Sequence, residues 1–197
     1  MRKLALLTFV TLDGVMQAPS VPEEDTSGGF EYGGWAQPYW DDVMSQVMRV
    51  AMAESYDLLL GRTTYDLFSS TFPNAPDDNP VASKLNSAVK YVVTSKDDLT
   101  WANSHRISGE AATQIAKLKS TDGPLLQVHG SWQLIQTLLA NELVDEFRLW
   151  SFPVVVGKGK RLFGDNAACS SLELTYSESC PNGVVMHIYR PQGEHTG

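Results

Sequence analysis

Short apolar runs that pass directly into turns of glycine, serine or threonine constrain the fold of this chain more than any other feature. Most of them precede a segment whose apolar residues recur at helical spacing. Strands that alternate with helices in this way predict a mainly parallel sheet with helices packed on it. The runs span Leu4–Leu12, Asp57–Gly61, Lys90–Thr94 and Leu125–Val128.

Several helices are expected between these strands. Pro38 predicts the start of the first one, because proline suits a first-turn position, and Asp41 and Asp42 suit the positive end of the helix dipole. Its expected buried face consists of Trp40, Val43, Met44, Val47 and Ala51. Further helices are expected over 62–68, over 108–119 with Ser108 as the N-cap, and from Trp132 onward.

The last third of the chain predicts strands that follow one another without a helix. Glu146–Val156 reads as a long strand with a kink at Pro153, and Leu172–Tyr176 and Val184–Tyr189 flank a Pro-Asn-Gly turn. The fold class is therefore α/β, with a central, mostly parallel sheet, antiparallel C-terminal strands and flanking helices. We expect a single domain over residues 1–197, without internal repeats.

Residues 17–38 form a long segment rich in glycine, proline and acids. Loops of this length inside compact domains are commonly lids or binding loops. Phe30, Tyr32 and Trp35 argue against a simple solvated linker, which seldom carries so many aromatic residues. Residues 73–80 predict a second, proline-rich loop.

Composition excludes several classes of protein. A formal net charge of -8 disfavours non-specific binding to nucleic acids or anionic membranes. The apolar N-terminal stretch is too short to span a bilayer and reads as a strand, so we expect a cytoplasmic protein. Cys169 and Cys180 lack CxxC spacing and the histidines are scattered, so no metal site is predicted and the cysteines are expected to be reduced. No GxSxG hydrolase motif is present.

Two turns between a strand and a helix are candidate anion sites. Gly61-Arg62-Thr63-Thr64 combines a helix N-terminus with a permanent cation and two hydroxyl groups, which suits a phosphate. His129-Gly130-Ser131-Trp132 has the same form, with a glycine that allows close backbone approach. Each is also compatible with an ordinary β-to-α turn, but ligands of open sheets bind beyond the carboxyl ends of strands, where both would lie.

Three other turns are weaker candidates. Thr94-Ser95-Lys96 offers hydroxyl groups and a cation after a strand. Asp13, at the end of the first strand, could face a substrate or simply form an Asp-Gly turn. The basic glycine-rich segment 157–161 lacks the spacing of a P-loop and is expected to be a solvated turn, with Leu162 and Phe163 packed inward.

Five segments follow one another along the chain: LDGVMQAP, LLLGRTTYD, KYVVTSK, LLQVHGSWQLIQTLL and LVDEFRLWSFPVVVGKGKRLF. Their order resembles the dihydrofolate-reductase-like superfamily, in the branch that contains the reductase domain of riboflavin biosynthesis, the RibD C-terminal domain. The resemblance covers roughly residues 3 to 190, and the last segment is the most specific.

The resemblance implies a bound NADPH and a map of its site. Gly61, Arg62, Thr63 and Thr64 would hold the phosphate near the adenine ribose, and Thr94, Ser95 and Lys96 would lie along the adenosine half. His129, Gly130, Ser131 and Trp132 would take the pyrophosphate, and Thr11, Leu12 and Gly14 would flank the nicotinamide. Asp13, Trp35 and Trp40 are candidates for the substrate side. A homodimer is also implied.

The chain departs from the family in three places. No acid maps onto the first helix, where a folate reductase has one that faces the pterin. His129-Gly130-Ser131 replaces the Glu-Gly-Gly of the riboflavin-type pattern, and loop 17–38 is longer and more aromatic. The expected function is an NADPH-dependent reductase of a small planar heterocycle, such as a pterin or pyrimidine. The alternatives are a non-catalytic NADPH-binding or sensor module and a structural or interaction domain.

Overall fold

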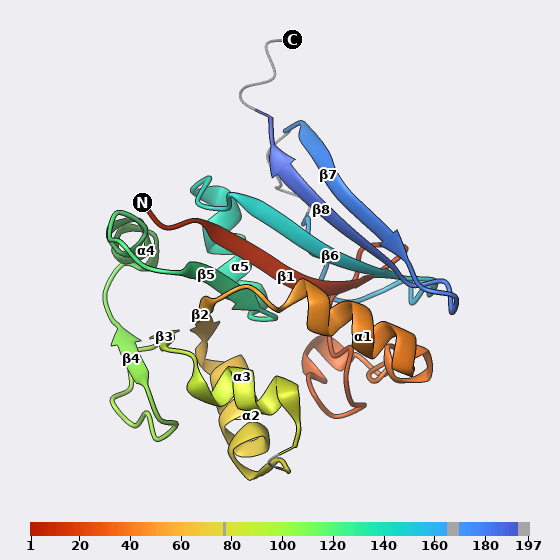
Figure 1. Ribbon diagram of the computed structural model, residues 1–197, viewed down its shortest axis with the longest axis horizontal. Helices are drawn as coiled ribbons and strands as arrows, with labels where there is room; N and C mark the ends of the chain where they lie inside the picture. Colours follow the sequence, from red (N-terminus) through yellow and green to blue (C-terminus); the bar gives the residue numbers. More distant parts are fainter. Residues whose placement is uncertain (77, 165–169, 193–197) are drawn as a thin grey trace.

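A single sheet forms the centre of the molecule. The computed structural model describes residues 1–76, 78–164 and 170–192, in which eight strands lie in the order β4-β3-β2-β5-β1-β6-β8-β7 (Figure 1). The pairs from β4 to β6 are parallel, and β8 pairs antiparallel with β6 and β7. The strands are β1 Leu4–Thr11, β2 Tyr56–Gly61, β3 Lys90–Val93, β4 Ser104–Ile107, β5 Leu125–His129, β6 Glu146–Phe152, β7 Leu172–Ser179 and β8 Val185–Pro191.

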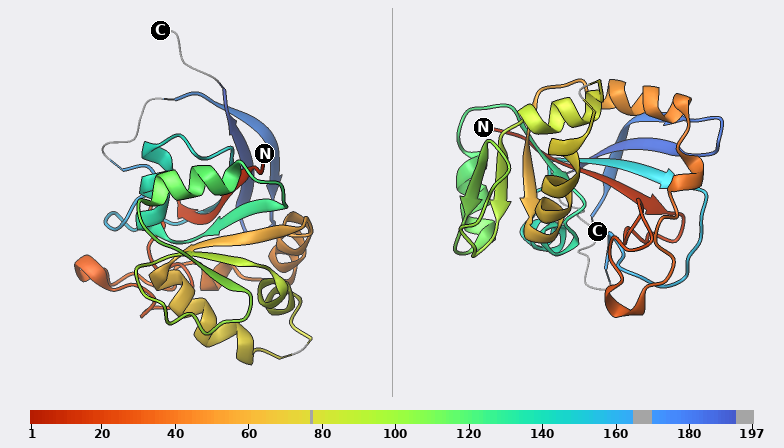
Figure 2. Two further views of the ribbon diagram at one scale, coloured as in Figure 1. Left: turned by 90° about the vertical axis from the view of Figure 1, so that its left-hand side faces the viewer. Right: turned by 90° about the horizontal axis from the view of Figure 1, so that it is seen from below.

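Helices cover both faces of the sheet (Figure 2). Side-chain alternation in β2 separates the two cores: Leu58 and Leu60 pack toward one face, and Leu59 packs toward the other. We call them the α1 face and the α5 face. The α1 face carries α1 (Asp42–Ala51), α2 (Arg62–Thr71) and α3 (Pro80–Ser87), and the α5 face carries α4 (Ala111–Lys119) and α5 (Trp132–Ala140). The expected α/β class, with a central, mostly parallel sheet, antiparallel C-terminal strands and flanking helices, is confirmed.

Two helix starts differ from the sequence prediction. Pro38 lies in a separate 3-10 turn, Gln37–Tyr39, and α1 begins only after Asp41, whose side chain accepts the N–H of Met44 at 2.7 Å. The start of α4 is capped by Glu110 rather than Ser108. In both places an acidic side chain satisfies free N–H groups of the first turn.

The later start of α1 also changes its buried face. Met44 and Met48 are buried, whereas Val43 and Trp40 are about half exposed. Val47 is partly buried as expected, and the side chain of Ala51 lies outside the described part.

Three segments differ in type or length. Helix α3 and the short strand β4 were not predicted, because α3 follows a proline-rich loop and three of the four residues of β4 are polar. The predicted strand 146–156 stops at Phe152, before Pro153, which cannot donate to a strand ladder. Of the two residues expected to pack inward after the basic segment, Leu162 is buried and Phe163 is exposed.

Loop 17–38 packs against the carboxyl end of β1 (Figure 2, right). The indole N–H of Trp35 donates to the carbonyl of Gln17 at 2.8 Å, and the Gln17 amide donates in turn to the carbonyls of Asp25 and Ser27. Phe30 and Trp35 are buried in the core of the α1 face, and Tyr32 is exposed. The loop is therefore held by buried aromatic rings. No helix in the described residues has the length and apolar character that crossing a membrane requires.

Candidate functional site

The carboxyl ends of β2, β5 and β1 lie side by side at one edge of the sheet. From β1 and β2 the chain passes to helices on the α1 face, and from β5 it passes to α5 on the opposite face. Such a divergence is a topological switch point, where open α/β sheets bind ligands. The turns that the sequence singled out as anion sites therefore lie where this architecture binds them.

The turns after β2 and β5 are joined by hydrogen bonds. The Gly61 N–H donates to the Ser131 hydroxyl at 2.9 Å, and the Ser131 N–H donates to the Thr64 hydroxyl at 3.0 Å. The Ser131 hydroxyl donates to the carbonyl of His129 at 3.0 Å. Two of the groups that were expected to bind an anion, the Ser131 N–H and the Thr64 hydroxyl, thus bond to each other.

Left-handed backbone shapes the start of α5. Gly130 and Ser131 have φ values of 50° and 61°. A Cβ on residue 130 would lie 3.4 Å from the Thr64 hydroxyl oxygen, which is an ordinary contact, so glycine is favoured there by its positive φ alone. Ser131 accepts this conformation without capping α5 through its side chain.

Helices α2 and α5 differ from the other three in their N-termini. Asp41, Asn79 and Glu110 cap α1, α3 and α4 with side-chain oxygens, but no side chain of the described residues caps α2 or α5. Their first-turn N–H groups remain available beside each other at the switch point. A helix N-terminus with free N–H groups and the positive end of its dipole is suited to bind an anion.

Arg62 connects the first turn to the third. Its guanidinium pairs with Asp66 at 2.8 Å, one helical turn away, and with Asp98, which follows the Thr94–Lys96 turn. The hydrogen bond from Arg62 lowers the pKa of Asp98. Neither acid was predicted as a partner of Arg62. The pair with Asp66 follows ordinary i, i+4 helical spacing, whereas no local pattern relates Arg62 to Asp98, 36 residues away. Within the Thr94–Lys96 turn, the Thr94 hydroxyl accepts the N–H of Lys96 at 3.1 Å.

Asp13 links the turn after β1 to the segment after β6 by hydrogen bonds. Its carboxylate accepts the N–H groups of Val156 and Gly157 at 3.3 and 2.8 Å and the hydroxyl of Thr11 at 2.6 Å. Arg161 lies 3.8 Å away. The hydrogen bond from Thr11 is the largest cause of the lowered pKa of Asp13.

The other residues of this turn frame the end of the strand. Thr11 is buried, Leu12 is exposed, and Gly14 has a φ of 81° that permits the reversal. Gly14 thus shapes the turn, and Leu12 presents its side chain to solvent at the edge that the cofactor map assigns to the nicotinamide.

The basic segment 157–161 lies next to the start of α5. The Trp132 indole donates to the carbonyl of Arg161 at 2.9 Å, and the Lys160 ammonium lies 5.6 Å from the centroid of the Trp132 ring. Lys160 also pairs with Asp25 of loop 17–38 at 2.6 Å. As expected, this segment is a solvated turn, because all of its residues except Lys160 are exposed, and the fold places it between the α5 N-terminus and that loop.

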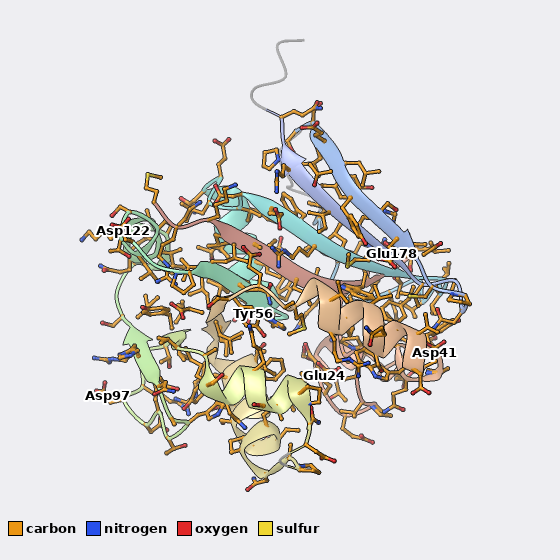
Figure 3. The ribbon with its side chains drawn as sticks, in the orientation of Figure 1. Glu24, Asp41, Tyr56, Asp97, Asp122 and Glu178 are labelled. Atoms are coloured by element: carbon orange, nitrogen blue, oxygen red, sulfur yellow. The ribbon has the colours of Figure 1, made fainter. Side chains whose placement is uncertain are left out.

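His129 has a buried, neutral ring. Burial lowers its pKa to about 4, and Arg148 adds to the effect. The Gln127 carbonyl oxygen accepts Arg148 at 3.1 Å, which turns the amide NH₂ toward Nε2 of His129, 2.9 Å away. The ring therefore accepts at Nε2. Its side chain faces Tyr56, which lies between α1 and α3 (Figure 3), so only the backbone of His129 reaches the turn.

A cavity of about 320 Å³ lies under loop 17–38. Phe9 and Ala36 lie deepest, and Ser20, Gln37 and Trp40 form an exposed rim. The rings of Phe9 and Trp40 meet at 49° with centroids 5.9 Å apart. The substrate-side candidate Trp40 therefore lines a cavity, whereas Trp35 packs against Phe152 in the core.

A second, larger hollow lies at the amino ends of the parallel strands. This groove has a volume of about 460 Å³ and runs between α1 and the β7–β8 hairpin. On its floor Arg148 pairs with Glu146 and Glu54, and it reaches across β1 to Gln127. Ala5 of β1 lies opposite both Gln127 and Glu146 in the sheet. Its small methyl group leaves room for the Arg148 side chain to cross β1 and bond to Gln127.

The cysteine and metal predictions are only partly addressed by the structure. Cys180 is a buried free thiol, and Cys169 lies outside the described residues. Across the described ranges, histidine, cysteine and acidic side chains form no group of three that could hold a metal ion.

Comparisons with known proteins place this chain in a family. Two uncharacterised proteins of Bacillus subtilis (strain 168) are similar over nearly their whole length. YyaP is 32% identical, with 98% of this chain and 96% of YyaP covered, and YwjB is 26% identical, with 96% and 98% covered.

Solved structures agree on the fold. A protein from Shewanella sp. PV-4 whose name assigns it to riboflavin biosynthesis has a TM-score of 0.59 at 19% identity, with 98% of this chain and 99% of that chain covered. A pyrimidine reductase-like protein from Corynebacterium diphtheriae has the same TM-score at 13% identity, with 98% and 93% covered. The model of the RibD C-terminal domain matches residues 2–186, and the chain therefore belongs to the RibD C-terminal domain family.

Proposed function

We propose that this protein is an NADPH-dependent reductase that transfers hydride to a small planar heterocycle, such as a pterin or pyrimidine. The observation that carries the proposal is the pair of uncapped helix N-termini, α2 and α5, joined at the switch point of the sheet. NADPH has two phosphate groups, its pyrophosphate and its 2′-phosphate, which fit such a pair of anion sites. Membership of the RibD C-terminal domain family supports a reductase.

The proposed cofactor site follows the edge of the sheet. Gly130, Ser131 and Trp132 would hold the pyrophosphate at the start of α5. Thr63 and Thr64 would bind the phosphate near the adenine ribose at the start of α2, and Thr94, Ser95 and Lys96 would line the adenosine half. Thr11, Leu12 and Gly14 would flank the nicotinamide. NADPH, when bound, supplies the hydride, and these residues orient it.

Arg62 would give the preference for NADPH over NADH. A guanidinium binds a 2′-phosphate in a bidentate manner, and NADH has no such group. Because Arg62 already pairs with Asp66 and Asp98, the phosphate would replace Asp98 as its partner. Asp13 would serve this site by holding the segment after β6 in place.

Titration of NADPH and NADH, followed by tryptophan fluorescence, tests this proposal. We expect saturable quenching by NADPH and much weaker quenching by NADH. Arg62→Ala should lose that preference, whereas Arg106→Ala should retain it, because Arg106 forms the neighbouring pair with Asp97. No saturable change with either nucleotide, together with no thermal shift, would remove the reductase proposal.

A non-catalytic NADPH-binding or sensor module is the second candidate. It is favoured by Asp13, whose carboxylate oxygens are engaged by backbone N–H groups, and by the non-ionisable lining of the cavity. Such a module would bind NADPH and leave its absorbance at 340 nm unchanged with every pterin, pyrimidine or quinone supplied. Consumption of NADPH with any of them would exclude this candidate.

We also propose that the reductase works in the cytoplasm as a homodimer. The groove between α1 and the β7–β8 hairpin offers a surface for the second copy, because Val50 and Tyr176 are exposed beside paired charges. Light scattering should give twice the chain mass, and Val50→Asp should return it to the mass of one chain. A wild-type mass of one chain would contradict the dimer.

A further inference from the structure

We infer that the cavity under loop 17–38 selects an uncharged planar aromatic ring and rejects its anionic derivatives. This inference rests on the proposed function, since it names the class of substrate for that reductase. It concerns the cavity lined by Phe9, Ser20, Ala36, Gln37 and Trp40.

The aromatic walls define the shape of the ligand. Phe9 and Trp40 enclose a corner of the cavity, with ring planes tilted by 49°. A flat ring can stack on one wall and present its edge to the other, an arrangement that aromatic pairs prefer. A volume of about 320 Å³ suits one small bicyclic ring system.

The polar rim can recognise amide-like edges. The Gln37 side chain makes no hydrogen bond to any residue in the described part of the chain, so its carbonyl and NH₂ are both available. A ring with adjacent donor and acceptor atoms, as in pterins and pyrimidines, can bond to both at once. The Ser20 hydroxyl lies on the same rim and adds a second polar contact.

The charge around the cavity excludes anions. None of the lining residues is ionisable. The two ionisable groups that adjoin them are acids: Glu24 accepts the N–H of Ser20 at 2.7 Å, and Asp41 follows Trp40 and caps α1. Glu24 and Asp41, labelled in Figure 3, both lie in the segment that connects β1 to β2. Two lysines contact loop 17–38, and each lies near an acid: Lys160 pairs with Asp25 at 2.6 Å, and Lys158 lies 4.0 Å from Glu31. A phosphate or carboxylate here would find no counter-ion and two acids beside it.

The cavity is also within reach of the proposed cofactor site. Phe9 and Thr11 point to the same face of β1, and residues two apart on a strand are separated by about 7 Å. Thr11 belongs to the turn proposed to flank the nicotinamide. A ring on Phe9 and Trp40 would therefore lie beside the group that delivers the hydride.

Pterin and pterin-6-carboxylate form a matched pair of probes, because at neutral pH they differ by one negative charge. Calorimetric titration of the wild-type chain should give at least tenfold tighter binding of pterin. Trp40→Ala should weaken pterin binding about tenfold. Gln37→Arg places a cation on the rim and should reverse the preference, whereas Gln192→Arg adds the same charge at a distant exposed position and should leave the preference unchanged.

The inference is overturned if wild-type protein binds the two probes equally, binds the carboxylate more tightly, or binds neither. A parallel titration with NADPH separates this failure from that of the proposed function. If NADPH binding saturates but the protein does not prefer pterin over pterin-6-carboxylate, only the assignment of the cavity fails. The pterin preference without any binding of NADPH keeps the cavity assignment and removes the reductase.

Discussion

The hydroxyl group of Ser131 accepts the backbone N–H of Gly61 at 2.9 Å, so one side chain ties the turn after β5 to the turn after β2. These two turns carry the uncapped helices of the candidate site. Their spacing is thus set by a bond that lies inside the site, and a ligand that bridges both helices depends on it.

Ser131→Ala should therefore weaken both the fold and the site. It leaves the Gly61 N–H without its partner, which we expect to lower the free energy of unfolding by about 1–3 kcal/mol. NADPH affinity should fall about tenfold. Ser131→Gly separates the loss of the hydroxyl group from the backbone strain. Glycine adopts a φ of 61° without strain, but it also lacks the hydroxyl group. Urea unfolding and fluorescence titration measure both effects, and unchanged NADPH affinity in both variants would contradict this role.

In the proposed cofactor site, Asp98 would compete with the 2′-phosphate of NADPH for Arg62. Asp98→Asn removes that competition, so NADPH affinity should rise several-fold while NADH affinity stays unchanged. Asp97→Asn is the matched control, since Asp97 pairs with Arg106 instead. Fluorescence titration with both nucleotides measures the ratio. Weaker NADPH binding by Asp98→Asn would mean that Asp98 positions Arg62 for the phosphate.

His129 makes stability depend on pH in mildly acidic solution. Burial lowers its folded pKa from 6.5 to about 4, so between these values the unfolded chain binds a proton that the folded chain does not. The free energy of unfolding should therefore fall as the pH drops from about 6.5 to about 4, by about 3 kcal/mol from this group.

Urea unfolding across that range measures the effect. His129→Gln should lose less stability between pH 6.5 and 4 than wild type does, although it starts from a lower value. His105→Gln, at an exposed position, is the control and should follow the wild-type curve. An identical acid dependence in wild type and His129→Gln would rule out this origin.

The ion pair between Lys160 and Asp25 links loop 17–38 to the start of α5. Asp25→Asn should release the loop, which limited proteolysis would detect as faster cleavage within 17–38. The cost in stability should be only about 1 kcal/mol, because both side chains are partly exposed. Glu31→Gln is the control, since Glu31 and Lys158 are highly exposed and 4.0 Å apart. Equal cleavage rates in the two variants would contradict the link.

Much of the fold could be predicted from local pattern. Asp57–Gly61 predicted β2, because a continuous apolar run that ends in glycine is typical of a buried parallel strand. The first helix was placed too early, because Pro38 is compatible with a helical first turn and equally with the 3-10 turn that forms. The side chain of Asp41 decides between them by accepting the N–H of Met44.

The candidate site was predictable only as separate turns. Glycine and hydroxyl residues after strands identified the turns near Gly61 and Gly130. The contacts that join them, from Ser131 to Gly61 and from Arg62 to Asp98, connect residues 70 and 36 positions apart. They arise because the sheet places β5 beside β2 and β2 beside β3, and neither pairing is visible in the local sequence.

The small side chain of Ala5 has a consequence for how the sheet comes apart. Because Arg148 passes over it to Gln127, the strands on either side of β1 share one polar network. If the β6–β8–β7 half opened alone, Gln127 and His129 would remain in an apolar interior without the hydrogen bond that Arg148 donates to Gln127. The two halves should therefore open together, with amide hydrogens of β5 and β6 exchanging at the same rate in the native protein. A bulky residue at position 5 would uncouple them.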